Sequence, residues 1–82
     1  MSKIAVRFFA RYAELAGCTW SHVNVETPTT VAEVIAAVRE MFPGTKDLPP
    51  QPLAAVNLRQ VRLDGAVNEG DEVALLPPLA GG

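Results

Sequence analysis

The sequence predicts an α+β fold in which one main helix packs against one mixed sheet. Three observations support this fold: a period-two pattern at residues 3–9, an apolar stripe at helical spacing over residues 31–42, and strand-like segments at 53–58, 60–63 and 72–76. Strands grouped around one amphipathic helix are typical of α+β domains. The 82 residues of the chain can build one compact core and therefore one domain.

The N-terminal quarter predicts a strand, a short helix and a second strand. Alternate residues of segment 3–9 are apolar, and its two phenylalanines indicate a central strand with both faces partly covered. Residues 10–16 are mostly good helix formers and stop at Gly17, because glycine adopts the left-handed turn that ends a helix. Residues 19–26 alternate again, so we expect them to form a hairpin with the first strand.

The main helix is predicted from Thr30 to about Met41. Thr30 and Glu33 have the spacing of a capping box, and Pro43-Gly44 ends the helical pattern. Its apolar stripe consists of Val31, Val34, Ile35, Val38 and Phe42. We expect this stripe to bury the inward-facing residues of the sheet, namely Ile4, Val6, Phe8, Val23, Val25, Val56 and Val73.

The C-terminal half predicts a loop, a hairpin and a last strand. Residues 45–52 contain three prolines and read as a loop, and a tight turn at 57–59 separates two short strands. The last strand, 72–76, ends at Pro77-Pro78, where two amide donors are missing. This order of elements predicts a β-grasp (ubiquitin-like) roll over residues 1–76, followed by a flexible tail at 77–82.

Composition excludes several classes of function. Seven basic and nine acidic residues give a net charge of −2, with no basic cluster for nucleic acid. No run approaches the roughly 18 apolar residues of a membrane span, and Arg7 interrupts any signal-peptide pattern at the N-terminus. The single cysteine, Cys18, excludes an internal disulfide and a cysteine-based zinc site. We therefore expect a soluble cytoplasmic protein without a metal site.

The last residues carry the most specific chemistry in the chain. Pro77 and Pro78 favour an extended path, and at about 3.1–3.4 Å per residue the segment 77–82 reaches roughly 20 Å. Gly81 and Gly82 lack side chains, so a narrow channel in another protein can admit the terminal carboxylate. That carboxylate could react with ATP to give an acyl-adenylate, which a sulfur nucleophile could convert into a thiocarboxylate. A diglycine ending also arises by chance, but the proline spacer directly after a strand favours the functional reading.

Over nearly its full length the chain resembles the MoaD-like small subunits of molybdopterin synthase, which are ubiquitin-like sulfur carriers. The resemblance rests on Phe8-Phe9-Ala10 followed by Glu14-Leu15-Ala16-Gly17, on Ala55-Val56-Asn57, and on Gly70-Asp71-Glu72-Val73-Ala74 running into Pro77-Pro78 and Gly81-Gly82. Three places depart from the common pattern. Leu75-Leu76 stands where an aromatic pair is frequent, and Leu79 stands where valine or isoleucine is usual. Ala13 replaces a frequent arginine, although the side chain of Arg11 could reach a similar place.

The resemblance implies a sulfur carrier that has no catalytic residues of its own. An E1-like (MoeB-like) adenylating enzyme would use ATP to activate Gly82, which would then become the thiocarboxylate. The tail would insert into the large subunit of molybdopterin synthase, where the catalytic residues are expected. The inserting tail comprises Pro77, Pro78, Leu79, Ala80, Gly81 and Gly82. Two carriers would donate two sulfurs to cyclic pyranopterin monophosphate within a heterotetramer, and no cofactor would be bound by the carrier.

The residues also suggest a partner surface and leave alternatives open. Phe9 and Leu76 are apolar on the sheet face away from the helix, and Arg11 is the partner contact that the resemblance implies. Other open functions are a carrier for thiamine, tRNA thiolation or sulfur amino acids, a modifier joined to lysines, and a binding module with an inert tail. Cys18 and His22 are interpreted as structural residues, whereas Trp20 could be a partner contact or a sheet-covering residue.

Overall fold

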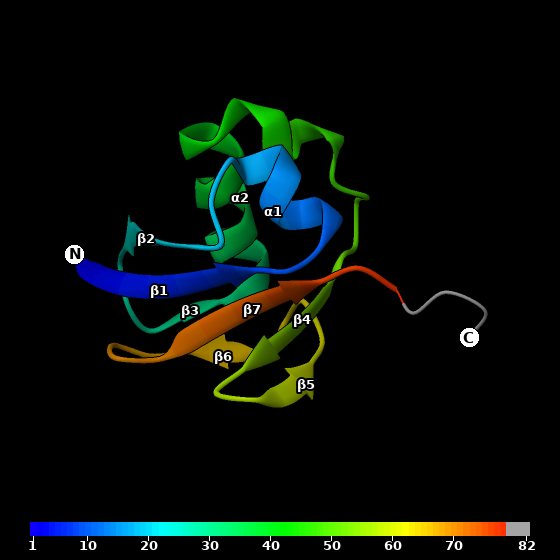
Figure 1. Cartoon of the computed structure of the whole chain (residues 1–82). Coiled ribbons are helices and arrows are strands. Elements are labelled where there is room, and N and C mark those ends of the chain that lie inside the picture. Colours follow the sequence, from blue (N-terminus) through cyan, green and yellow to red (C-terminus); the bar gives the residue numbers. More distant parts are fainter. Residues whose placement is uncertain (79–82) are drawn as a thin grey trace.

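The structure is a computed structural model that describes residues 1–78. The strands are β1 (Ser2–Phe8), β2 (Trp20–Val25), β3 (Thr29–Thr30), β4 (Leu53–Val56), β5 (Arg59–Val61), β6 (Ala66–Val67) and β7 (Glu72–Leu76). The helices are α1 (Arg11–Ala16), α2 (Val31–Met41) and the 3₁₀ helix η1 (Pro43–Asp47). Figure 1 shows the main helix α2 packed on one side of the sheet, with α1 at the end of β1.

The first and last strands lie side by side in the middle of the sheet. The five-stranded sheet has the order β2-β1-β7-β4-β5, in which β1 pairs parallel with β7 and every other pair is antiparallel. The predicted hairpin of the first two strands is confirmed by the pairing of Ser2 with Val25 through Arg7 with Trp20. A mixed sheet on one main helix confirms the predicted β-grasp roll.

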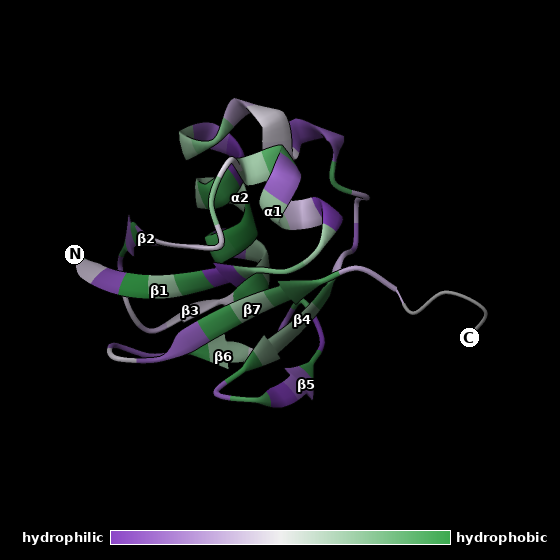
Figure 2. Ribbon diagram, viewed as in Figure 1, coloured by the Kyte–Doolittle hydropathy of each residue, from purple (hydrophilic) through white to green (hydrophobic). Residues whose placement is uncertain are grey.

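The core lies between α2 and the sheet face that it covers. All of Val31, Val34, Ile35 and Val38 are buried, as the apolar stripe predicts. On the sheet side the large, fully buried side chains of the five-stranded sheet are those of Ile4, Val6, Phe8, Val23, Val73 and Leu75, whereas Val25, which was also predicted to be buried, is half-buried. Figure 2 shows this concentration of hydrophobic residues on α2 and along the central strands. At about 1.5–3 kcal/mol for each large buried side chain, this interface is the main source of stability.

Two predictions about the elements are wrong. β1 ends at Phe8, so Phe9 lies outside the strand, and the second face of β1 is not covered because Lys3 and Arg7 are exposed. The predicted loop at 45–52 begins inside η1, since the three prolines come later in the segment. The sequence analysis also missed the two-stranded ribbon β3-β6, whose strands of two residues are too short to show a period.

The ends of α2 are held by side-chain hydrogen bonds. Thr30 Oγ1 accepts from the Glu33 amide at 3.3 Å, which is the first half of the predicted capping box. At the other end, the Arg39 guanidinium donates to the carbonyl oxygens of Thr45, Leu48 and Pro49 at 3.0, 3.3 and 2.8 Å. Arg39 therefore fixes the path of the chain after η1 and points away from β2.

Gly44 allows η1 to approach α1 closely. A Cβ atom at Gly44 would collide with the carbonyl oxygen of Leu15, so only glycine fits there without a backbone shift. Thr45, the next residue, is fully buried and donates from its hydroxyl to the Val38 carbonyl at 3.2 Å. These contacts fix α1, and with it Arg11, relative to the main helix.

Candidate functional site

The tail leaves the domain from the middle of the sheet. β7 ends at Leu76 between β1 and β4, and Pro77 and Pro78 follow without amide donors. Pro77 is half-buried and Pro78 is exposed. Because both neighbours of β7 hold it, the exit point has a fixed position and direction. The remaining residues of the predicted tail, Leu79, Ala80, Gly81 and the sulfur-carrying Gly82, lie outside the described residues.

Two of the predicted partner residues lie at this exit. Phe8 pairs with Leu75 in the parallel ladder, so Phe9, the first residue after β1, and Leu76, the last residue of β7, lie at the same end of the two strands. Phe9 is 42% exposed, and Leu76 is half-buried against its ladder partner Leu53. We refer below to these two apolar residues at the base of the tail, Phe9 and Leu76, as the collar.

Arg11 lies at the start of α1, two residues beyond Phe9. Its side chain is 74% exposed, and its guanidinium is 3.9 Å from the Glu14 carboxylate one helical turn along. An exposed pair at this distance contributes little to stability, because solvent screens it. The guanidinium is therefore available to an acidic group of a partner.

The sheet face away from α2 has a small-residue floor. Ala74 pairs with Arg7 on one side and with Ala55 on the other, and both alanines are buried although no helix covers them. A groove of about 480 Å³ crosses this floor and is lined by Arg7, Phe9, Asn57, Leu58, Glu72 and Ala74. The groove begins at the collar and has both apolar and charged walls, which suits contact with another protein.

Leu58 is the most protruding apolar side chain beside this groove. It is 91% exposed at the tip of the β4-β5 turn. Asn57 and Leu58 both have positive φ angles, 49° and 72°, a conformation that is unfavourable for leucine. The sequence analysis predicted the tight turn at 57–59 but extended the preceding strand to Leu58, whereas β4 ends at Val56, and it did not assign Leu58 to the partner surface. Asn57 could have indicated that the turn begins before Leu58, because asparagine tolerates the left-handed conformation.

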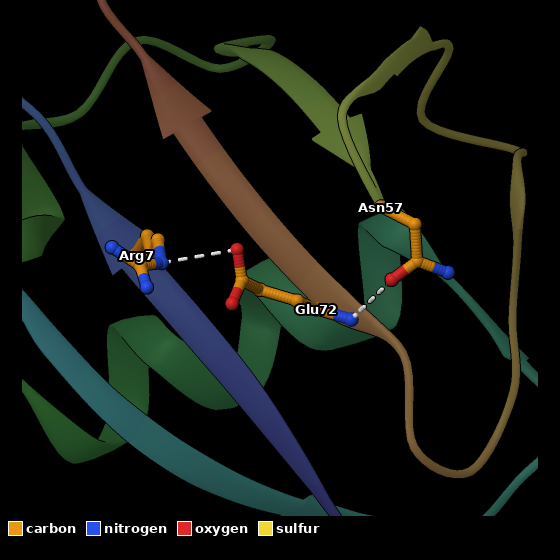
Figure 3. Close-up of polar contacts among 3 residues, drawn as sticks. All are labelled: Arg7, Asn57 and Glu72. Carbon is orange, nitrogen blue, oxygen red and sulfur yellow. Dashed lines mark hydrogen bonds and ion pairs between the residues drawn. The ribbon is translucent and has the colours of Figure 1, made fainter.

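A polar network crosses the floor of the groove (Figure 3). Arg7 Nε lies 3.0 Å from Glu72 Oε1, and the Glu72 amide donates to Asn57 Oδ1 at 3.0 Å. The Asn57 amide in turn donates to the Glu72 carbonyl at 2.9 Å, so Asn57 fastens the β4-β5 turn to the start of β7. Arg7 was interpreted as solvated or as a partner contact, and the structure instead pairs it with Glu72.

Asp71 completes the network by turn chemistry. Its carboxylate accepts from the Asn68 amide at 2.8 Å and from the Asn57 side-chain amide at 2.9 Å. These two hydrogen bonds, the backbone one first, lower the pKa of Asp71 below its ordinary value. The interpretation of Gly70-Asp71 as turn chemistry is confirmed.

The lowered pKa of Asp71 predicts a pH-dependent contribution to stability. A depressed pKa in the folded state means that the stabilisation is fully present above the unfolded pKa of about 3.9 and is lost as the pH falls through the folded value. Because the carboxylate is exposed, we expect Asp71→Asn to lower the free energy of unfolding at pH 7 by about 1 kcal/mol or less. The difference from wild type should vanish in strong acid, as measured by urea titration across pH.

Asp64→Asn is the matched control, since the Asp64 carboxylate makes no hydrogen bond to residues 1–78. It removes the same charge and should change the pH dependence much less. A carbon-detected titration of the Asp71 carboxyl that gives an ordinary or raised pKa would contradict the assignment.

Other residues singled out by the sequence have structural surroundings. Cys18 is half-buried, and His22 stacks edge-to-face on Trp20 with ring centroids 4.4 Å apart at the sheet edge. Trp20 is 48% exposed and does not cover the sheet. Within residues 1–78, no three His, Cys, Asp or Glu side chains converge as a metal site. None of the helices in this range has the length and apolar character needed to cross a membrane.

Two curated relatives resemble the whole chain. The molybdopterin synthase sulfur carrier subunit of Escherichia coli is 35% identical, with 96% of this chain and 99% of the relative covered. The small archaeal modifier protein 3 of Haloferax volcanii is 30% identical, with 98% and 99% covered. Similar relatives therefore include both a sulfur carrier and a protein named as a modifier.

Solved structures confirm the β-grasp fold. SAMP1 of Haloferax volcanii matches with a TM-score of 0.86 at 28% identity, covering 99% of this chain and 100% of that one. The BexX/CysO complex of Amycolatopsis orientalis contains a chain that matches with a TM-score of 0.71 at 26% identity, covering 96% of this chain and 99% of that one. A chain in the complex of subunits 1 and 2 of molybdopterin-converting factor from Helicobacter pylori matches with a TM-score of 0.68 at 23% identity, covering 98% of this chain and 99% of that one.

The family model for the ThiS family matches residues 6–82, which include the strand, the proline pair and the glycine pair of the predicted carrier. Together with the relative from Escherichia coli, this match shows that the chain belongs to the ThiS family of ubiquitin-like sulfur carriers.

Proposed function

We propose that this protein carries sulfur as a thiocarboxylate on Gly82 and donates it in the synthesis of molybdopterin. The observation that carries the proposal is the exit of the chain from the central strand β7 at Leu76, directly into Pro77-Pro78. The rigid exit is followed directly by a proline spacer, and proline favours an extended backbone. The relative from Escherichia coli bears the name of a sulfur carrier subunit, which supports the pathway.

Two reactions would load Gly82. A carboxylate oxygen of Gly82 attacks the α-phosphorus of ATP, pyrophosphate leaves, and an acyl-adenylate forms. The terminal sulfur of a donor persulfide then attacks the acyl carbon, AMP leaves, and an acyl disulfide forms. A second thiol attacks the donor's sulfur, forms a disulfide with it and releases the thiocarboxylate. An E1-like (MoeB-like) enzyme would catalyse both reactions and bind the ATP, so the carrier would need no cofactor of its own.

The large subunit of molybdopterin synthase is the second proposed partner. The carrier would contact it through the collar and Arg11, while the segment from Pro77 to Gly82 enters its active site. The exposed apolar surface of Phe9 would be buried and the guanidinium of Arg11 would meet an acidic group. The solved complex of subunits 1 and 2 from Helicobacter pylori agrees with a small subunit acting in an assembly. We propose a cytoplasmic heterotetramer with two carriers.

The proposed loading is tested by intact mass measurement. Incubation with an E1-like enzyme, ATP and a sulfur donor should replace one terminal oxygen of the carrier by sulfur, in proportion to the ATP consumed. Addition of the large subunit and cyclic pyranopterin monophosphate should return the carrier to its original mass as molybdopterin forms. A mass that stays unchanged under conditions that load a known carrier would refute the proposal.

A second candidate function is protein modification, which the similarity to small archaeal modifier protein 3 favours. In that case the acyl-adenylate of Gly82 would react with a lysine amine and form an isopeptide bond with loss of AMP. Tryptic digests of cells that express the protein would then contain lysines bearing its C-terminal residues. A pterin product without such adducts selects the sulfur carrier, and adducts without the pterin product select the modifier.

A further inference from the structure

The strand β2 is an edge strand without the usual protection. It lies at the end of the sheet order, and only β1 pairs with it among residues 1–78. Its sequence, Trp20-Ser21-His22-Val23-Asn24-Val25, contains neither proline nor lysine, the residues that commonly block pairing at an edge. Six residues of extended backbone are therefore presented to an incoming strand.

The ladder register identifies the backbone groups on the outer edge. The Phe8 amide donates to the Thr19 carbonyl at 2.9 Å, so Phe8 and Thr19 form a hydrogen-bonded pair. Hydrogen-bonded and non-hydrogen-bonded pairs alternate along an antiparallel ladder. The amide and carbonyl groups of Trp20, His22 and Asn24 consequently point outward, away from β1.

A groove adjoins the C-terminal end of this edge, between the end of β2, the segment that follows it and α2. It has a volume of about 490 Å³ and is lined by Met1, Asn24, Val25, Glu26, Pro28, Thr29, Glu33, Ala36, Ala37 and Glu40. The alanines of α2 leave room beside the strand, and Val25 and Pro28 make the opposite wall apolar. A strand added to β2 would place the side chains that lie beside Val25 on the α2 side of the sheet into this groove.

The rim of the groove is acidic. Glu26, Glu33 and Glu40 all line it, and the two ion pairs within residues 1–78 involve other carboxylates, those of Glu14 and Glu72. Arg39, the basic residue of α2, donates instead to carbonyl oxygens beyond the helix. Among the residues that line the groove, three carboxylates therefore stand against one cation, the α-amino group of Met1, and the groove is net acidic.

We propose that β2 binds an extended basic segment of another protein as an additional strand of the sheet. Backbone hydrogen bonds to Trp20, His22 and Asn24 would provide the pairing, and apolar side chains would enter the groove beside Val25. Lysine or arginine side chains of the segment would meet the three glutamates, and on the other sheet face a cation could stack on the exposed ring of Trp20.

The charge of the groove disfavours a second copy of this chain as the occupant. The β2 strand of a second copy contains no lysine or arginine to meet the three glutamates, and each copy carries a net charge of −2. β1 also separates this edge from β7, so the proposed binding and the tail chemistry can occur together.

The test uses the full chain and a synthetic octapeptide, acetyl-Lys-Arg-Val-Thr-Lys-Arg-Val-Thr-amide, in which lysine and valine share one face of the strand and arginine lies on the other. Addition of the peptide should slow hydrogen exchange at the amides of Trp20, His22 and Asn24 and shift the resonances of Ala36 and Ala37. Glu33→Gln with Glu40→Gln should weaken binding about three- to tenfold, since each exposed charge pair is worth up to about 1 kcal/mol. Both positions are on the surface of α2, and folding is checked by the unchanged core resonances.

Three controls make the result specific. Glu14→Gln removes a carboxylate from α1 and should leave the affinity unchanged. The same peptide with glutamate in place of lysine and arginine should bind more weakly than the basic peptide. Proline at the third and sixth peptide positions removes a donor from each peptide edge and should abolish the protection of the β2 amides.

Several results would overturn the proposal. One is slower hydrogen exchange on peptide addition only at the amides of β5 or beside Leu58, with unchanged exchange at the amides of β2. Another is equal affinity for the basic and acidic peptides. A third is a dimer of the protein alone whose β2 amides are already protected, because the occupant would then be a second copy.

Discussion

Phe8→Ala is expected to remove a large part of the free energy of unfolding. Phe8 is 2% exposed and packs edge-to-face on Phe42 with ring centroids 5.6 Å apart. Truncation of a buried phenylalanine costs about 3–5 kcal/mol, through lost burial and the cavity that remains. A domain of this size has a total stability of about 4–12 kcal/mol, at roughly 0.05–0.15 kcal/mol per residue. Urea titration and thermal unfolding measure the loss.

Phe9→Ala is the matched control for this substitution. The change is chemically identical at the next residue, but Phe9 lies outside β1 and is 42% exposed. We expect its free energy of unfolding to change by about 1 kcal/mol or less. In contrast, the affinity for the large subunit should fall, because Phe9 belongs to the collar. Equal destabilisation by the two substitutions would show that Phe9 is part of the core and would contradict the assignment.

Deletion of Gly82 is expected to lower the rate of sulfur loading at least a hundredfold without changing stability. The shortened chain still ends in a glycine carboxylate, so its intrinsic reactivity is the same. Its carboxylate, however, is displaced by about 3.3–3.6 Å along the tail. Misplacement of a reacting group by 1 Å can already cost about a hundredfold in rate. The rate of ATP-dependent mass change measures loading, and urea titration measures stability.

Gly82→Ala is the companion variant, because it keeps the length of the tail and adds one methyl group. It should load faster than the deletion and more slowly than wild type, since reach is restored but the channel is narrowed. Stability should be unchanged in both variants, because within residues 1–78 the buried hydrophobic residues end at Leu75. Loading of the deletion variant at the wild-type rate would contradict a role for the terminal carboxylate position.

The fold was predictable where a long segment has one strong period. The residues of α2 repeat at helical spacing and all four predicted core positions before Phe42 are buried. β7 is bounded by a glycine turn and a proline pair, and its predicted limits match the structure. By contrast, β3 and β6 have two residues each, and η1 follows a proline that suggested only the end of a helix. Such short elements depend on tertiary contacts and leave no periodic signal.

The candidate site was predictable residue by residue but not in its pairings. Phe9 and Leu76 were recognised as exposed apolar residues, yet their placement at the same end of the two strands depends on the parallel register of β1 and β7. The same register places Arg7 next to Glu72, which no local pattern shows. Leu58 was missed because a turn tip is usually polar, so a leucine there resembles the continuation of a strand.

The central position of β7 also determines how the domain responds to mechanical load. A strand at the edge of a sheet can be peeled away one hydrogen bond at a time, whereas β7 is flanked by β1 and β4 along its length. A pull on Pro78 therefore loads two ladders in shear, and many bonds must break together before the strand slides. A partner that draws the chain end into a channel can apply force to it while the β-grasp domain stays folded.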